Sequence, residues 1–328
     1  MKYILNNSLN PYFNLALEEH IFKTVGMDDD FIILWQNDKT IVIGRHQNTI
    51  EEVNSDFVKE NNINVVRRIT GGGAVYHDLG NLNFSFITGY DKNDKIDYKK
   101  YTIPVINALD KIGIKAELSG RNDLTIDGKK FSGNAQSLHK GRILHHGTLL
   151  FNSDLDVVSK ALNVKADKIK SKGIKSVRSR VTNISDYLDK SIEIGEFKDI
   201  LLKNLFEEND LQEYIITEDD LKAINELKDN KYNTWEWIYG KSPKFNFKSS
   251  KWFTNGNIEV LLNVKGGIIT DCKIYGDFLA LYGIDEVEKN ICGLQYEENV
   301  IENLIKSFDL VKYFGNITLE EVLSCFFN

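Results

Sequence analysis

Five short runs of β-branched and aromatic residues follow one another closely in the first 90 residues of the chain. Segments of this length and composition are typical of β-strands, and they cover residues 31–35, 40–44, 64–69, 73–77 and 81–87. In the last run Leu82, Phe84 and Phe86 alternate with polar residues, so one side of that strand is apolar. The runs predict a large sheet domain.

Helical patterns surround these strands. Asn10 followed by Pro11 has the form of an N-cap and a first helical residue, and an apolar helix face follows. Strands are predicted again at 123–126 and 142–151, and from residue 155 to about 230 the apolar spacing becomes helical. Together these elements predict an α+β fold with a large mixed sheet.

The length of 328 residues favours two domains, at roughly 100–200 residues each. Residues 239–250 are polar and contain Pro243, which is typical of a linker. We therefore expect a large domain, 1–246, and a small α+β domain, 247–328. The small domain is expected to contain a strand at 251–264 that forms a hairpin with the residues following it.

Composition narrows the class of protein. Hydrophobic residues make up 42% and charged residues 27%, as expected for a globular protein with a sizeable core. No run approaches the roughly 18 apolar residues of a membrane span, and no signal peptide is apparent, so a cytoplasmic protein is expected. The net charge of −7 disfavours a general nucleic-acid binder.

The three cysteines, Cys272, Cys292 and Cys325, all lie in the last third of the chain and show no C-x-x-C spacing. This argues against a disulfide framework or a cysteine zinc site, and we expect no metal held by the protein itself. The six histidines all lie between His20 and His146, so the two parts of the chain differ in composition.

The most informative motif is a run of three glycines, 71–73, between two strand-like segments. Glycines at such a turn let backbone amides approach an anion closely. The motif is neither a P-loop nor a dinucleotide fingerprint, and three glycines by themselves are better explained by a flexible hairpin turn. Arg68 precedes the loop and offers a guanidinium suited to phosphate or carboxylate, whereas the adjacent Arg67 must point to the other face. Hydrogen-bonding groups around the turn come from Thr70, His77 and Asn81.

A second motif centres on the hairpin signal Asp127-Gly128. It would place Asp123 and Lys130 on neighbouring strands, with Lys129 solvated at the turn. A third segment, 142–150, is a strand with His145 and His146 on opposite faces, a spacing unsuited to binding one metal ion. We interpret His146 as a wall of the site and His145 as structural.

As a set, these segments resemble lipoate–protein ligases, the lipoate branch of the biotin/lipoate ligase family. The chain's last part resembles the accessory domain of the bacterial two-domain ligases, with weaker motifs. The matching stretches cover the first half of the chain, in the family's order: NPYFNLALEE (10–19), IVIGRHQN (41–48), RRITGGGAVYHDLGN (67–81), GRNDLTIDGKKFSGNAQ (120–136) and HHGTLL (145–150).

The resemblance implies an ATP-dependent ligase that forms lipoyl-AMP from lipoate and transfers the lipoyl group to a lysine of a carrier protein. Lys130 would be catalytic and contact both the carboxylate and the α-phosphate. Thr70 replaces a common serine and Tyr76 a common phenylalanine. The implied site for ATP, lipoate and lipoyl-AMP comprises Arg68, Thr70, Gly73, Ala74, Val75, Tyr76, His77, Asn81, Asp123 and Lys130, to which the strand interpretation adds His146.

The same resemblance implies Mg²⁺ bound with the nucleotide. The implied partners are lipoyl domains of 2-oxoacid dehydrogenase E2 subunits, the glycine cleavage H protein, or both, with the enzyme a monomer that binds neither nucleic acid nor membrane. The apolar side of strand 81–87 is expected to hold the acyl tail. Residues 160–180 carry eight lysines and arginines against one acid, and are either a solvated surface or a contact for the nucleotide or an acidic carrier.

Two alternatives belong to other classes of function. A lipoyl or octanoyl transferase of the same fold would need a nucleophilic cysteine in the pocket, and the catalytic part has none. A non-catalytic lipoate- or carrier-binding protein would not need Lys130. A biotin ligase is disfavoured because Arg-Arg-Ile-Thr-Gly-Gly-Gly stands in place of the characteristic biotin loop.

Overall fold

The computed structural model describes the chain except residues 27, 92–95, 163–179, 206–211, 240–245 and 328. Within this part, a mixed sheet of eight strands has the order β11-β1-β2-β6-β10-β9-β8-β7. Its strands are β1 (Lys2–Leu5), β2 (Phe31–Trp35), β6 (Asn81–Gly89), β7 (Glu117–Ser119), β8 (Asp123–Ile126), β9 (Lys129–His139), β10 (Arg142–Leu150) and β11 (Gln212–Glu213). The strands predicted between residues 31 and 151 are confirmed, with shifts of a few residues at their ends.

A second, smaller sheet has the order β4-β3-β5 and carries the glycine loop between β4 and β5. Its strands are β3 (Thr40–Ile43), β4 (Asn64–Arg67) and β5 (Val75–His77). The helices of this part are α1 (Pro11–Lys23), α2 (Thr49–Glu52), α3 (Ser55–Glu60), α4 (Lys99–Asp110), α5 (Leu155–Ala161), α7 (Ile194–Leu205), α8 (Glu218–Leu227) and α9 (Trp235–Ile238), with a 3-10 turn at Ile184–Tyr187 and a π turn at Lys228–Tyr232.

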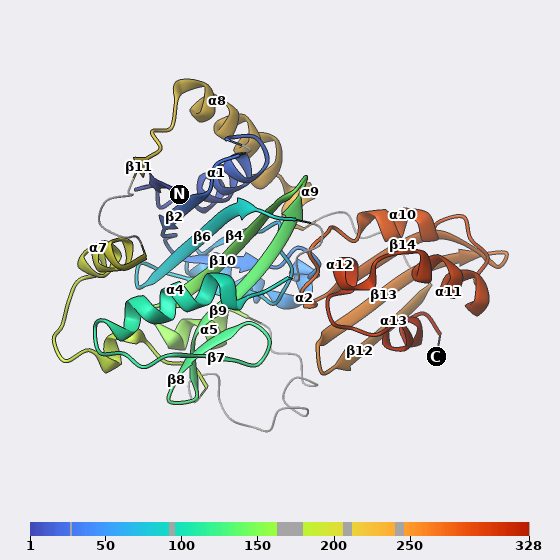
Figure 1. The fold of residues 1–328 in the computed structure, drawn as a ribbon. Coiled ribbons are helices and arrows are strands. Elements are labelled where there is room, and N and C mark those ends of the chain that lie inside the picture. Colours follow the sequence, from blue (N-terminus) through green and yellow to red (C-terminus); the bar gives the residue numbers. More distant parts are fainter. Residues whose placement is uncertain (27, 92–95, 163–179, 206–211, 240–245, 328) are drawn as a thin grey trace.

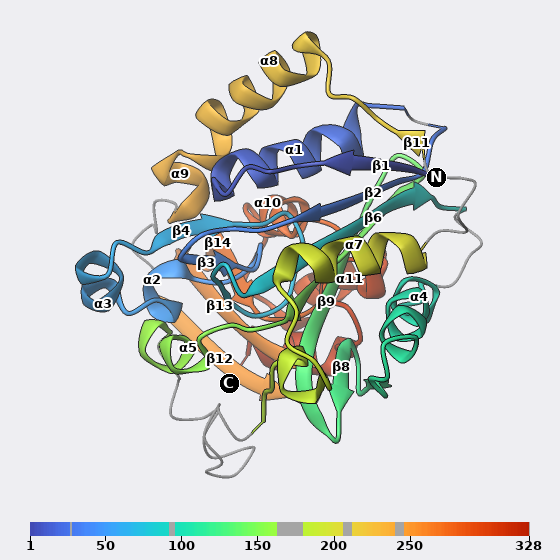
Figure 2. The same ribbon diagram turned by 90° about the vertical axis from the view of Figure 1, so that its left-hand side faces the viewer.

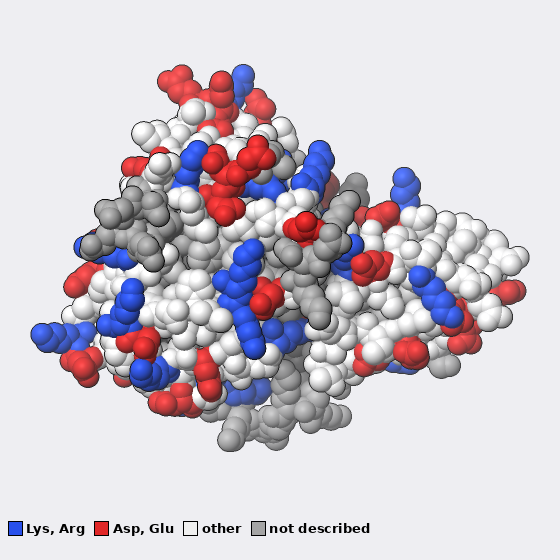
Figure 3. All heavy atoms as spheres, viewed as in Figure 1, with Lys and Arg blue, Asp and Glu red and all other residues white. Residues whose placement is uncertain are grey.

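Helices cover both faces of the large sheet, with α1 and α8 on one side and α4 and α7 on the other (Figures 1 and 2). Helix α1 begins as predicted, because the Asn10 side chain accepts hydrogen bonds from the backbone N–H groups of Tyr12 and Phe13. Acidic side chains gather over the exposed end of α8, where Glu218 and Asp219 open the helix (Figure 3).

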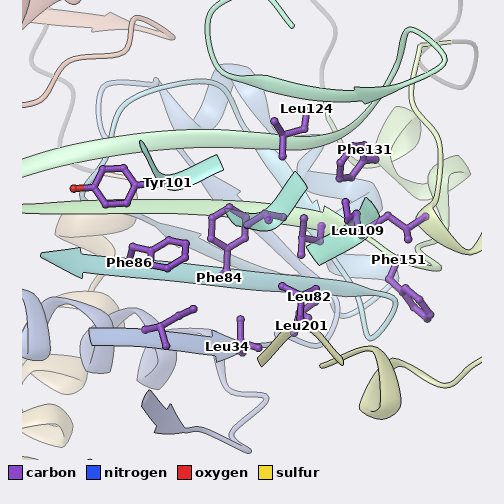
Figure 4. Packing of buried hydrophobic residues seen from close by; sticks show 14 of the residues in the cluster. Leu34, Leu82, Phe84, Phe86, Tyr101, Leu109, Leu124, Phe131, Phe151 and Leu201 are labelled. Carbon is purple, nitrogen blue, oxygen red and sulfur yellow. The ribbon is translucent and has the colours of Figure 1, made fainter. Parts of the chain in front are cut away.

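The apolar side of β6 faces α4 and α7. Leu82, Phe84 and Phe86 pack in one buried cluster with Tyr101 of α4 and Leu201 of α7 (Figure 4). The opposite side of the strand, which carries Asn81, Asn83 and Ser85, faces α1. The prediction that the apolar side of strand 81–87 holds the acyl tail is therefore wrong, because that side is filled by the protein's own core.

The C-terminal residues form a separate core around a three-stranded sheet. Its elements are β12 (Phe247–Phe253), β13 (Gly256–Lys265), β14 (Ile268–Gly276), α10 (Asp285–Ile291), α11 (Glu298–Ser307), α12 (Leu310–Phe314) and α13 (Leu319–Ser324). The prediction of one strand at 251–264 is wrong, because a turn at 254–255 divides this segment between β12 and β13. The predicted linker 239–250 lies partly outside the described residues, and its last four residues belong to β12.

The small C-terminal unit contacts the loop that carries the three glycines. The Gly72 N–H donates to the Phe278 carbonyl at 3.2 Å, and the His46 ring stacks on the Phe278 ring. Arg45 forms an ion pair with Asp285 at 2.9 Å. These contacts place the segment after β14 against the glycine loop. None of the helices in the part that the structure describes has the length and apolarity required to cross a bilayer.

Candidate active site

A cavity of about 130 Å³ lies between the large sheet and the glycine loop. Its walls come from α1, the small second sheet, the central strands of the large sheet and the segment after β14. Of the residues singled out from the sequence, those lining it are Arg68, Gly73, Ala74, Val75, His77, Lys130 and His146. Residues from motifs separated by more than 70 positions therefore meet at one place.

The glycine loop follows a path that side chains would obstruct. Gly72 has a φ of +91°, and a Cβ built on Gly44 would lie 1.8 Å from the Gly72 carbonyl oxygen. Within the described chain, the backbone N–H groups of Gly73 and Ala74 make no hydrogen bond, and both residues line the cavity. Two free amide donors at the cavity wall are suited to binding an anionic oxygen.

The Arg68 guanidinium holds this loop in place. It donates to the carbonyls of Gly71 and Gly73 at 2.7 and 2.8 Å, to Val42 at 3.1 Å, and through Nε to the Thr70 hydroxyl at 3.0 Å. Burial lowers the pKa of Arg68 from 12.5 to about 10, so the group remains charged at neutral pH. Most of its five donors are thus used within the protein, which makes Arg68 primarily a clamp on the loop.

Arg67 points to the opposite face, as the strand alternation predicts. Its guanidinium donates to the carbonyls of Gly44, Arg45, Gln47 and Ile238. It does not line the cavity. Its bonds join the loop after β3 to α9, so its contribution is to the scaffold.

A buried chain of hydrogen bonds runs from the loop to α1. The Thr70 hydroxyl lies 2.7 Å from His146 Nε2, and His146 Nδ1 lies 2.9 Å from a Glu18 carboxylate oxygen. The same oxygen accepts a bond from Ser85, whose hydroxyl accepts one from the Trp35 indole. The Thr70 oxygen also accepts from Arg68 Nε, so the hydroxyl connects the loop clamp to this chain.

Lys130 marks the accessible end of the cavity. Its ammonium forms an ion pair with Asp123 at 2.7 Å, and the two side chains are 39% and 37% exposed. The type of turn predicted at Asp127-Gly128 is present, with φ of +51° and +72°. Lys129 is exposed, as expected, whereas Lys130 lies beside Gly133 at the cavity wall.

The other end of the cavity is enclosed and largely apolar. Its walls include Leu15, Trp35, Val42 and Val75, and Leu279 from the C-terminal unit also lines the cavity. Trp35 is 3% exposed. This end has the character of a pocket for an apolar chain.

Four of the residues expected in the site do not line the cavity. Thr70 and Asp123 lie behind it and contact Arg68 and Lys130, which do line it. Tyr76 packs in the cluster around β3 and β4, where burial raises the pKa of its phenol to about 12. Asn81 is buried and donates to Asn83, which lines the cavity in its place.

Sequence analysis missed several lining residues. Trp35 lay on a predicted strand whose facing was not assigned. Asn83 lay on the side of strand 81–87 opposite to the one expected to hold the acyl tail, and Leu279 comes from the C-terminal unit. His145 stacks on Tyr101 in the core, which agrees with the structural role expected of it. Most of the basic stretch 160–180 falls outside the described residues.

Comparison with known proteins agrees with this geometry. Residues 10–206 match the lipoyl protein ligase A/B catalytic domain, and residues 242–326 match the bacterial lipoate protein ligase C-terminus. The chain is 50% identical over 327 residues to lipoate-protein ligase LplJ of Bacillus subtilis, covering 98% of this chain and 99% of that protein.

Solved structures show the same architecture. P. falciparum LipL1 in complex with lipoate has a TM-score of 0.79 at 31% identity, over 99% of this chain and 98% of that one. Lipoate-protein ligase A bound with ATP has a TM-score of 0.63 at 33% identity, over 73% and 98%. Because both parts of the sequence match and the similarity spans the full length, the chain belongs to the lipoate–protein ligase family.

Proposed function

We propose that this protein activates lipoate with Mg-ATP to lipoyl-AMP and transfers the lipoyl group to a lysine of a lipoyl-carrier protein. The observation that carries the proposal is one cavity that joins an enclosed apolar end to an end with a lysine and free loop amides. Support comes from the family, and from relatives whose structures contain lipoate or ATP.

In the first step, a carboxylate oxygen of lipoate attacks the α-phosphorus of ATP and pyrophosphate leaves. The carboxylate is already an anion, so this step needs positioning and charge neutralisation more than a general base. Lys130 is the cation at the accessible end, and the N–H groups of Gly73 and Ala74 are the free donors nearby. Magnesium enters as part of the nucleotide substrate.

Asp123 contributes by fixing Lys130. Its ion pair at 2.7 Å holds the ammonium at the mouth of the cavity, where both substrate anions must meet. Arg68 contributes by clamping the carbonyls of Gly71 and Gly73, which fixes the loop that carries the Gly73 and Ala74 amides. Thr70 acts through Arg68 and His146.

In the second step, the neutral amine of the carrier lysine attacks the carbonyl carbon of lipoyl-AMP, loses a proton, and displaces AMP. Lys130 is placed to stabilise the oxyanion that forms on the carbonyl oxygen. The proposed carriers are lipoyl domains of 2-oxoacid dehydrogenase E2 subunits, the glycine cleavage H protein, or both. A monomeric enzyme located in the cytoplasm also remains a prediction from the sequence.

The division into domains 1–246 and 247–328 is likewise proposed. The C-terminal part supplies Leu279 to the cavity wall and the Phe278 carbonyl to Gly72, so removing it would open that wall and release the loop. A soluble 1–246 fragment should therefore lose formation of lipoyl-AMP more than transfer from synthetic lipoyl-AMP. Equal loss of both activities would mean that the C-terminal part is merely a structural support.

The transferase alternative requires a thiol at the site, and no cysteine lines the cavity. Cys272 and Cys325 are buried in the C-terminal unit, and burial raises the pKa of both thiols. Cys292 is exposed on the same unit. This arrangement favours adenylate chemistry.

The test is to incubate the protein with lipoate, Mg-ATP and an unmodified lipoyl domain. We expect pyrophosphate release that depends on lipoate, together with the mass increase of one lipoyl group on the carrier. Omitting ATP should abolish both signals. Lipoyl transfer without ATP would support the transferase, and binding of lipoate without pyrophosphate release would support a non-catalytic protein.

A further inference from the structure

The enclosed end of the cavity contains a hydrogen-bond donor that the protein itself leaves unused. It belongs to His77, which is 3% exposed and lines the cavity. Its position and chemistry influence which acyl chain the enzyme prefers, an inference that rests on the proposed function.

A chain of amides fixes which nitrogen of His77 carries the proton. Asn14 Nδ2 lies 2.9 and 2.7 Å from the backbone carbonyls of Ser8 and Gln36, so this atom must be the amide nitrogen. The Asn37 side-chain atom 2.9 Å from this nitrogen is the amide oxygen, because an amide nitrogen in its place would set two donors against each other. The remaining group, Asn37 Nδ2, then donates to His77 Nδ1 at 3.1 Å.

His77 Nδ1 is therefore an acceptor, and the proton of the neutral ring lies on Nε2. Burial, with further contributions from Arg68 and His146, lowers the pKa of His77 to about 3, so the ring is neutral at physiological pH. Nε2 is buried and has no hydrogen-bond partner among the described residues. Both nitrogens of His146, by contrast, are engaged with Thr70 and Glu18.

The free donor lies far from Lys130. The cavity crosses the large sheet from Lys130 on β9, past Asn83 on β6, to Trp35 on β2. Three steps between neighbouring strands correspond to roughly 14 Å. The His77 ring centroid is 6.2 Å from that of Trp35, so the donor lies where the tail of an acyl chain would end.

An acyl tail that fills this end packs against the His77 ring, whose Nε2–H is already shielded from water. A plain alkyl tail leaves this buried donor without an acceptor, which is unfavourable. A divalent sulfur has lone pairs and accepts weakly. We infer that His77 Nε2–H is a specificity determinant that favours an acyl tail bearing divalent sulfur over a hydrocarbon tail of the same shape.

The test compares lipoate with 5-cyclopentylpentanoate, in which both ring sulfurs are replaced by CH₂, and with octanoate. Formation of the acyl-adenylate is followed by pyrophosphate release, and kcat/KM is measured for each acid. For the wild-type protein we expect lipoate to be favoured over the cyclopentyl analogue by roughly tenfold, mostly through KM. Equal use of the two acids would overturn the inference without any substitution being needed.

Two variants locate the effect. His77→Phe removes the donor and keeps an aromatic ring. The ratio of kcat/KM for lipoate to that for the analogue should therefore fall from roughly tenfold to about onefold. His77→Gln keeps an N–H donor and should retain most of the preference. A folded His77→Phe variant with the wild-type ratio would contradict the assignment to His77. Failure of the wild-type protein to activate any acid with ATP would instead overturn the proposed function.

Discussion

The two ends of the cavity are built by opposite strategies. At the Lys130 end, both side chains of the Lys130–Asp123 ion pair are more than a third exposed. At the Trp35 end every polar group is buried, and a chain of hydrogen bonds through Ser85 and Glu18 fixes its geometry. The end that carries the lysine is therefore accessible to large polar reactants, whereas the end lined by Trp35 is closed to solvent.

The difference follows from physical cost. A surface ion pair contributes about 0–1 kcal/mol to stability, so the Lys130 end can change for the reaction without threatening the fold. A buried polar group that loses its partner lowers the stability of the fold by about 1–3 kcal/mol, so substitutions at the Trp35 end should destabilise the protein. Substitutions at the two ends should therefore separate activity from stability.

The largest effect on activity is expected for Lys130→Ala. Removing a charge that stabilises a reacting oxyanion typically costs about 10²–10³ in rate. The free energy of unfolding should change by less than about 1 kcal/mol, because the pair with Asp123 is exposed. Stopped-flow pyrophosphate release and thermal unfolding measure the two quantities. Near-normal lipoyl-AMP formation by this variant would refute the role given to Lys130.

A smaller effect on activity, with a larger effect on stability, is expected for Thr70→Val. The valine keeps the shape of the fully buried side chain but leaves Arg68 Nε and His146 Nε2 without their partner. Unfolding should become easier by about 1–3 kcal/mol, and adenylate formation should fall roughly tenfold as the loop clamp loosens. Thr70→Ser is the matched control and should restore both. Identical behaviour of valine and serine would show that the hydroxyl is not used.

The pH dependence of the unfolding free energy tests whether the His77 ring near Trp35 is buried and neutral. The pKa of His77 is about 3 in the folded protein and near 6.5 when unfolded, so the unfolded state binds the proton first. Stability contributed by this group is present above about pH 6.5 and is lost progressively as the pH falls toward 3. His77→Gln should therefore narrow the difference in unfolding free energy between pH 7 and pH 5.5 by about 1 kcal/mol. Chemical denaturation at the two pH values provides the measurement, and an unchanged difference would argue against a neutral His77.

The smallest effect is expected for joint replacement of Cys272, Cys292 and Cys325 by alanine. All three lie outside the cavity, so lipoyl transfer to the carrier should stay within about twofold of wild type once folding is verified by circular dichroism. A folded variant without activity would support the transferase alternative, in which a cysteine carries the acyl group as a thioester.

Features with local causes were readable from the sequence. The Asn10 cap and the Asp127-Gly128 turn each depend on residues within four positions. The opposite facing of Arg67 and Arg68, and of His145 and His146, followed from the twofold period of a strand. The pairing of Lys130 with Asp123 followed from the hairpin between them.

Features with distant causes were not readable. The alternation in β6 identified two sides of the strand but not which side α4 would cover, and the polar side proved to face the cavity. Nothing near Leu279 indicates that it would lie beside Gly72, more than 200 residues away. The division of 251–264 into two strands depended on how β13 pairs with both neighbours.

The family, most of the strands in the first 151 residues and the charged residues of the site were predictable from the sequence, because they depend on composition and short spacing. Tertiary structure decided what those residues do. Arg68, which the sequence indicated as a ligand for phosphate or carboxylate, instead binds the backbone carbonyls of Gly71 and Gly73. Tertiary structure also fixed the proton of His77 through Asn14 and Asn37, since a tautomer depends on partners that only the folded chain brings within hydrogen-bonding distance.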